Sequence, residues 1–207
     1  MQMGGQNNFG VSTTTIREKF IQLENHWLTK RNQPNTLIQY HTNPKLIQKN
    51  LYLFEKIYRN IKTLNNVAIV HSSFPVVLSH MLYNVCNSKL TLISDHPGFV
   101  EARDFFENNY NATTITKSPL FDNINLQEYD LIIIPEYEYF VPLNLLDNFK
   151  NKTVALVHHI VHLNEGNDMN DVYSINDLYD KCSFTNIIDS SILNYDKFPI
   201  YCIIGNT

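Results

Sequence analysis

Polar and titratable side chains follow several apolar runs of this sequence at the point where each run ends. In chain order they are His71, Ser72, Ser73, Asp95, Ser118, Glu136 and His158. Open parallel sheets bind ligands outside the carboxyl ends of their strands, so we expect these side chains to share one site. Hydroxyl, carboxylate and imidazole groups there are suited to hold a polar ligand and to move protons. Strand ends are also polar simply because chains turn there, and that simpler explanation stays open.

Asp95 has two competing interpretations. Its carboxylate is suited to accept hydrogen bonds from two hydroxyl groups of a ligand. It also stands shortly before Pro97, where a helix is expected to begin, and aspartate commonly caps a first helical turn. The sequence alone leaves both roles open.

Glu136 and His158 are candidates for acid–base chemistry. Glu136 follows the apolar run 130–134. Its carboxylate is suited to act as a general base, and the alternative interpretation is that the residue belongs to a solvated loop. His158 ends the run 153–158, and an imidazole can act as a base near physiological pH. We assign both residues to the side of the site that would face a substrate.

The histidines near residue 160 raise the question of a metal site. His158 and His162 would share one face of a helix, with His159 and Glu165 close by, and such ligands suit zinc or iron. The β-branched residues between them and the loop-like segment 164–167 disfavour that helix. We therefore expect no bound metal.

Ser72 and Ser73 lie between an expected strand and an expected helix, as the nucleophile of many hydrolases does. The glycines of a G-x-S-x-G turn are absent here, and those glycines permit the strained turn that such a nucleophile needs. We therefore do not expect a serine hydrolase.

The size and charge of the chain exclude several classes of protein. Its 207 residues, with 43% hydrophobic content, suffice for one α/β domain with extra helices. A net charge of -4, with no block of like charges, predicts neither a nucleic-acid partner nor an anionic membrane partner. No apolar run approaches the ~20 residues of a membrane helix and no secretion signal is recognisable, so we expect a soluble, cytoplasmic protein. The sequence leaves open whether the chain forms a homodimer.

Three widely separated cysteines lie in or beside apolar runs. They are Cys86, Cys182 and Cys202. Their odd number and their spacing predict neither a disulfide framework nor a thiolate metal site. We expect all three to pack as small hydrophobic side chains.

The first third of the sequence predicts a helical extension over residues 12–65, after a disordered arm at residues 1–11. The apolar face of a first helix consists of Ile16, Phe20, Leu23 and Trp27. After a loop at residues 32–43, Pro44 opens a second helix. Its expected apolar face consists of Ile47, Leu51, Phe54, Tyr58 and Ile61. These two helices are expected either to cover one face of the sheet or to form a lid over its ligand edge.

Residues 66–207 are expected to form the α/β domain, as one folding unit with the helical extension. The expected strands are 66–70, 89–94, 111–116, 130–134, 153–158, 184–190 and 198–204. Helices are expected near Pro75, Pro97, Leu143 and Ser174. This alternation predicts a mostly parallel sheet with right-handed crossovers. The last two strands are joined by too few residues for a helix, so about seven strands end in a C-terminal antiparallel hairpin.

This order of elements resembles that of the class I S-adenosylmethionine-dependent methyltransferases, a Rossmann-like family. Residues 92–103 resemble its second strand, where an acidic residue at the strand end is followed by a helix. Residues 129–134 resemble the fourth strand with its aromatic-Asp lead-in, and residues 198–205 the closing strand of small-molecule O-methyltransferases. The resemblance covers roughly Val67 to Thr207. It implies S-adenosylmethionine as the cofactor and methyl transfer to a small molecule.

The resemblance also implies roles for individual residues. Asp95 would hold the ribose, while Ser72 and Ser73 would hold the amino-acid end of the cofactor. His71 and Ser118 would complete the cofactor site, and the two acid–base candidates would face the acceptor.

Two stretches differ from the family's pattern. Its first loop is normally glycine-rich, whereas residues 71–75 contain no glycine, and residues 116–119 lack the acidic residue expected after the third strand. Two alternatives therefore stay open: a noncatalytic interaction protein that has lost the cofactor, or a lyase or hydrolase that acts on the cofactor itself. Whether Phe74 fills the site or leaves an open pocket discriminates between an empty scaffold and a binding protein.

Overall fold

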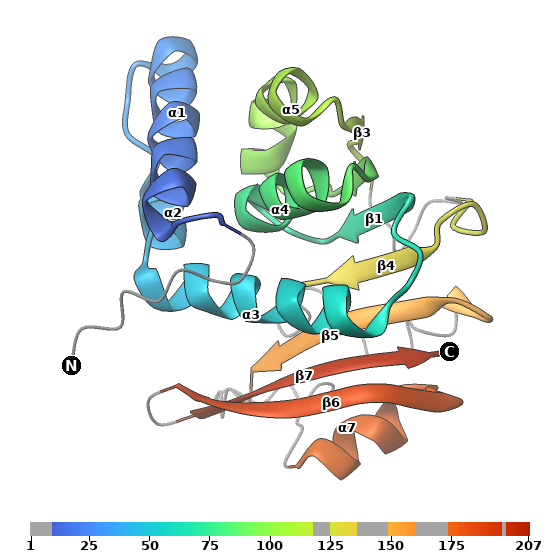
Figure 1. Ribbon diagram of the computed structural model, residues 1–207. Helices are drawn as coiled ribbons and strands as arrows, with labels where there is room; N and C mark the ends of the chain where they lie inside the picture. The colour runs from blue at the N-terminus through green and yellow to red at the C-terminus, as the bar shows by residue number, and fades with distance from the viewer. Residues whose placement is uncertain (1–9, 118–124, 136–148, 160–173, 196–197) are drawn as a thin grey trace.

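A seven-stranded sheet forms the centre of the computed structural model, which describes residues 10–117, 125–135, 149–159, 174–195 and 198–207 (Figure 1). Its strand order is β3-β2-β1-β4-β5-β7-β6. The strands are β1 (Asn66–Val70), β2 (Lys89–Ile93), β3 (Thr113–Ile115), β4 (Leu131–Ile134), β5 (Thr153–His159), β6 (Asn186–Tyr195) and β7 (Phe198–Asn206). Strands β1 to β5 pair in parallel, whereas β7 is antiparallel to both β5 and β6. The predicted α/β class, with its terminal hairpin, is therefore confirmed.

Alternate residues of the central strands enter two different apolar cores. Val67 and Ile69 of β1 face one core, and Ala68 and Val70 face the other. The helices are α1 (Thr13–Arg31), α2 (Thr36–His41), α3 (Pro44–Asn60), α4 (Val76–Cys86), α5 (Pro97–Tyr110) and α7 (Ile175–Lys181). Apolar residues of α1 to α5 belong to the first core, and Leu178 of α7 belongs to the second. Burial on both faces explains why the parallel strands read as continuous apolar runs rather than alternating ones.

Three helices precede β1, not the two predicted. The additional helix, α2, lies inside the expected loop 32–43. The Asn35 side chain caps it by accepting hydrogen bonds from the backbone amides of Leu37 and Ile38, at 2.9 and 3.3 Å. A helix of six residues is too short to show a periodic apolar face, and only Ile38 and His41 of α2 are buried. Sequence periodicity therefore could not identify it.

The buried face of α3 also differs from the prediction. Leu53 and Ile57 are fully buried, whereas Tyr58 is 48% exposed. The face is therefore rotated toward residues one position earlier in the sequence. The predicted contacts of Ile47 and Phe54 are confirmed, since both side chains are buried.

Polar contacts fix α1 against α5. Asp104 accepts hydrogen bonds from Lys30 at 2.6 Å and pairs with His26 at 3.0 Å, while Arg31 pairs with Glu101. Partial burial tends to raise the pKa of Asp104, but the hydrogen bonds from Lys30 and His26 outweigh it and lower the pKa. Helix α1 thus packs on α4 and α5, whereas α3 of the same extension packs on α4 and on strands β5 and β6.

Smaller differences concern where helices begin. Pro75 is the cap of α4 rather than its first helical residue, whereas Pro97 does open α5. Ser174 caps α7 as predicted, because its hydroxyl accepts from the Asp177 amide at 3.1 Å. The helix expected at 143–149 lies almost wholly outside the described residues, as does the expected arm at 1–11. Among the described helices, none combines the length and the apolar character needed to cross a membrane.

Candidate functional site

A pocket of about 230 Å³ lies at the carboxyl ends of β1 and β2. Its lining consists of His71, Ser73, Ser94, Asp95, His96 and Pro97. The structure thus brings together three of the residues selected from the sequence: His71, Ser73 and Asp95. Ser72, between the first two in the chain, is buried. Two adjacent parallel strands end here, which is the position where open α/β sheets bind ligands.

His71 is the most unusual residue of this pocket. Its φ of 56° lies in the left-handed region that favours glycine. Its backbone amide donates to the Ile93 carbonyl at 2.9 Å, which joins the ends of the two strands. The side chain is only 4% exposed, and its buried Nε2 atom has no hydrogen-bond partner among the described residues. Because His71 lines the pocket, its unsatisfied imidazole is a candidate contact for a ligand.

Burial lowers the pKa of His71 to about 4, although the nearby Asp95 carboxylate acts in the opposite direction. At a pH above 6.5, the ordinary pKa of histidine, the imidazole is neutral in both the folded and the unfolded chain. Between pH 6.5 and 4 only the unfolded chain takes up the proton, so the free energy of unfolding falls as the pH falls. The full loss amounts to about 3 kcal/mol, and it is complete below pH 4.

We expect His71→Asn to remove this part of the acid sensitivity, because asparagine does not titrate and tolerates a left-handed backbone. Urea unfolding of both proteins at a series of pH values from 7 to 4 measures the difference. His80, whose pKa burial also lowers, contributes equally to both proteins and cancels. Parallel stability curves for the two proteins would contradict the assignment of a depressed pKa to His71.

Asp95 is exposed at the mouth of the pocket, and it does not cap α5. That role belongs to His96, whose Nδ1 accepts from the Gly98 amide at 3.1 Å. The His96 amide in turn donates to the Ser94 hydroxyl at 3.2 Å. The capping interpretation of Asp95 is therefore wrong, and its carboxylate is available to a ligand.

Phe74 does not fill the pocket. Its ring is 2% exposed and packs edge-on against the rings of Trp27, His41 and His96, with centroids 6.4, 5.9 and 6.5 Å away. Gly98 permits this packing, because a Cβ atom there would lie 2.9 Å from the Phe74 ring. The glycine-free loop therefore leaves an open pocket beside it.

The described lining of this pocket does not include His158. Ser118 and Glu136 lie outside the described residues. His158 is 2% exposed within β5, directly opposite Tyr201 of β7. It lies near the carboxyl end of its strand.

His158 and His159 both belong to strand β5 and not to the helix considered for a metal site. Within the described ranges, no three metal-binding side chains of histidine, cysteine, aspartate or glutamate cluster together. His162 and Glu165 lie outside those ranges.

Two histidines of the site escaped sequence reasoning. His41 lies in a segment expected to be a loop, and its Nε2 is 3.0 Å from the Ser73 hydroxyl oxygen. His96 adjoins the predicted helix start at Pro97, and that proximity was the one available signal. Neither position belongs to a periodic pattern that a sequence would reveal.

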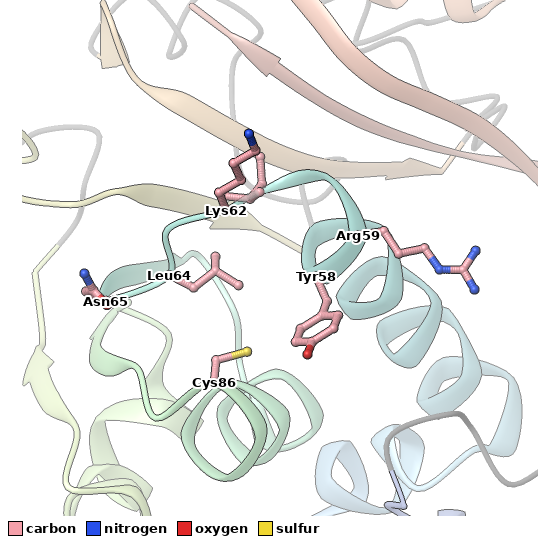
Figure 2. Close-up of a pocket in the computed structure, with 7 residues that line it drawn as sticks. Tyr58, Arg59, Lys62, Leu64, Asn65 and Cys86 are labelled. Carbon is pink, nitrogen blue, oxygen red and sulfur yellow. The ribbon is translucent and has the colours of Figure 1, made fainter.

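A second pocket, of about 450 Å³, lies at the opposite edge of the sheet, where β1 begins and α3 and α4 end (Figure 2). The Tyr58 ring and the Cys86 thiol are directed into it, whereas the Arg59 and Lys62 side chains extend away. Burial raises the pKa of the Cys86 thiol, which keeps the thiol protonated and poorly nucleophilic. This pocket therefore lacks the reactive groups of the first.

No protein-family model matches the sequence, and no curated protein matches it. The structure is similar to the N-methyltransferase NodS from Bradyrhizobium japonicum WM9 in complex with S-adenosyl-L-homocysteine. The TM-score is 0.61 at 11% identity, over 91% of this chain and 99% of NodS. A putative sarcosine dimethylglycine methyltransferase from Galdieria sulphuraria has a TM-score of 0.59 at 9% identity, over 84% of this chain and 88% of that one.

The geranyl diphosphate C-methyltransferase from Streptomyces coelicolor A3(2), in complex with Mg²⁺, geranyl diphosphate and S-adenosyl-L-homocysteine, is a third similar structure. Its TM-score is 0.53 at 8% identity, over 78% of this chain and 80% of that one. These similarities extend over most of each chain. The chain has the Rossmann-like fold of the class I S-adenosylmethionine-dependent methyltransferases.

Proposed function

We propose that the chain binds S-adenosylmethionine in the pocket at the ends of β1 and β2 and transfers its methyl group to a small molecule. The observation that carries the proposal is this pocket itself, which is lined by both the exposed Asp95 and the buried His71. Two of the similar structures contain S-adenosyl-L-homocysteine. A nucleoside ligand would supply hydroxyl groups for Asp95 and a hydrogen-bond partner for His71.

The described residues are suited to bind the ribose and the amino-acid end of this cofactor. Asp95 would accept from the ribose hydroxyls, and Ser72 and Ser73 would receive the amino-acid end. The pocket is smaller than the ~300 Å³ at which most ligand sites begin, so the described residues enclose only part of such a ligand. The left-handed conformation at His71 supplies the backbone turn for which glycine is normally used.

The cofactor would supply an activated methyl group on a sulfonium, and the protein would contribute chiefly by positioning the acceptor in line with it. Glu136 and His158 are the candidates for the acceptor side. A neutral imidazole or a carboxylate there would take up the proton that an acceptor hydroxyl or amine releases.

Isothermal titration calorimetry with S-adenosyl-L-homocysteine tests the binding step. At protein concentrations well above micromolar we expect saturable heat, and no heat with either S-adenosylmethionine or its product would contradict the proposal. Chromatography of the protein incubated with S-adenosylmethionine alone distinguishes a methyltransferase from the alternatives. Cleavage of the cofactor without an acceptor would indicate a lyase or hydrolase, and binding with no turnover across acceptors would indicate a noncatalytic protein.

A further inference from the structure

A buried polar contact joins the N-terminal helices to the loop after β1, residues 71–75. The Nε2 atom of His41, the last residue of α2, lies 3.0 Å from the hydroxyl oxygen of Ser73. Both side chains are buried, with exposed fractions of 8% for His41 and 4% for Ser73. Water therefore competes little for this hydrogen bond, and the bond fixes the Ser73 side chain at the wall of the pocket.

Aromatic packing supports the same contact. The His41 ring meets the ring of Phe74, the next loop residue, at 5.9 Å and an interplanar angle of 80°. The ring of Trp27, from α1, also packs edge-on against the Phe74 ring. Two consecutive loop residues are thus fixed by side chains from outside the α/β domain.

The contact between His41 and Ser73 matters because the loop at residues 71–75 contains no glycine. A glycine-rich loop approaches a ligand with its backbone, whereas residues 71–75 must use side chains. A serine hydroxyl rotates freely unless a neighbour fixes it, and each hydrogen bond to a ligand requires one orientation. We propose that His41 is a positioning residue for the cofactor site, acting through Ser73, and that the N-terminal helices thereby complete that site. This inference rests on the proposed function, because it concerns the same ligand.

Calorimetry with S-adenosyl-L-homocysteine on a set of full-length variants tests the inference. His41→Phe keeps a ring against Phe74 but removes the nitrogen, and we expect about tenfold weaker binding. His41→Gln places an amide nitrogen within reach of Ser73, and we expect its affinity to return to within about threefold of the wild type. Adding Ser73→Ala to His41→Phe is expected to weaken binding no further than Ser73→Ala alone.

Tyr40→Phe is the matched control, since this neighbour on α2 is 52% exposed and the change keeps its ring. Its affinity is expected to equal that of the wild type. A merely structural His41 would lower the free energy of unfolding without changing affinity, or its effect would add to that of Ser73→Ala, and either result overturns the inference. If His41→Phe does not fold, Ser73→Ala removes the same bond, and unchanged affinity there overturns the inference too. Absence of heat with the wild type would reject the proposed function and this inference together, whereas binding unaffected by the variants rejects the inference alone.

Discussion

Replacing Asp95 with asparagine is expected to weaken the binding of S-adenosyl-L-homocysteine by about 100-fold. The carboxylate would accept hydrogen bonds from two ribose hydroxyls, and a hydrogen bond to a charged group contributes about 1.5–3 kcal/mol. Asparagine keeps the shape of the side chain but retains only one neutral acceptor oxygen, so the loss approaches 3 kcal/mol. Calorimetric dissociation constants for the two proteins measure the effect directly.

Asp180→Asn provides a matched control for Asp95→Asn. Asp180 is an exposed aspartate on α7, whose buried Leu178 belongs to the second core, and no residue of that helix lines the pocket. The control makes the same change in net charge, so it reveals any effect of long-range electrostatics. Because the Asp95 side chain is exposed and does not cap α5, neither variant should lose more than about 0.5 kcal/mol of stability. Equal affinities for the wild type and Asp95→Asn would exclude the carboxylate as a ribose ligand.

The sheet was predictable because its strands are buried on both faces. A run such as Leu131–Ile134 has no polar position to satisfy, and only a parallel sheet covered by helices buries such a run completely. The terminal hairpin followed from the few residues between the last two strands. Local composition and chain length thus determined most of the topology.

The site was predictable only at its strand ends. His71 and Asp95 follow apolar runs, and topology places the ends of β1 and β2 side by side. His41 was not predictable, because its contact with Ser73 spans 32 residues and depends on how a six-residue helix packs. Contacts of that kind are set by tertiary packing and leave no periodic signal.

The family resemblance rested in part on two acidic residues, Asp95 and Asp130, which have different roles in the structure. Asp95 lies in the pocket, whereas Asp130 of the aromatic-Asp lead-in lies at the opposite edge of the sheet. Its carboxylate accepts from the backbone amides of Asn65 and Asn66, at 3.0 and 2.9 Å, and so holds the start of β1 beside β4. The lead-in motif therefore has a structural role here, and only the acidic residue after β2 points to a ligand.

Stability measurements can show whether the N-terminal helices unfold together with the sheet. Phe20 of α1 is 1% exposed and belongs to the same apolar core as Ile69 of β1 and Phe106 of α5. A side chain shared in this way couples the unfolding of the helices to that of the sheet. Together with the ion pairs between α1 and α5, this shared core predicts one folding unit over residues 12–207.

Phe20→Ala is accordingly expected to lower the free energy of unfolding of the whole chain by about 3–5 kcal/mol, because it leaves a cavity in that core. Ile21→Ala, on the same helix but at a position 54% exposed, is expected to change it by less than about 1 kcal/mol. Urea unfolding followed by both far-ultraviolet circular dichroism and Trp27 fluorescence measures the two variants. One coincident transition that shifts to lower urea in Phe20→Ala is the expected outcome. Loss of the Trp27 signal at low urea, with the sheet still folded, would instead show that the helical extension unfolds independently.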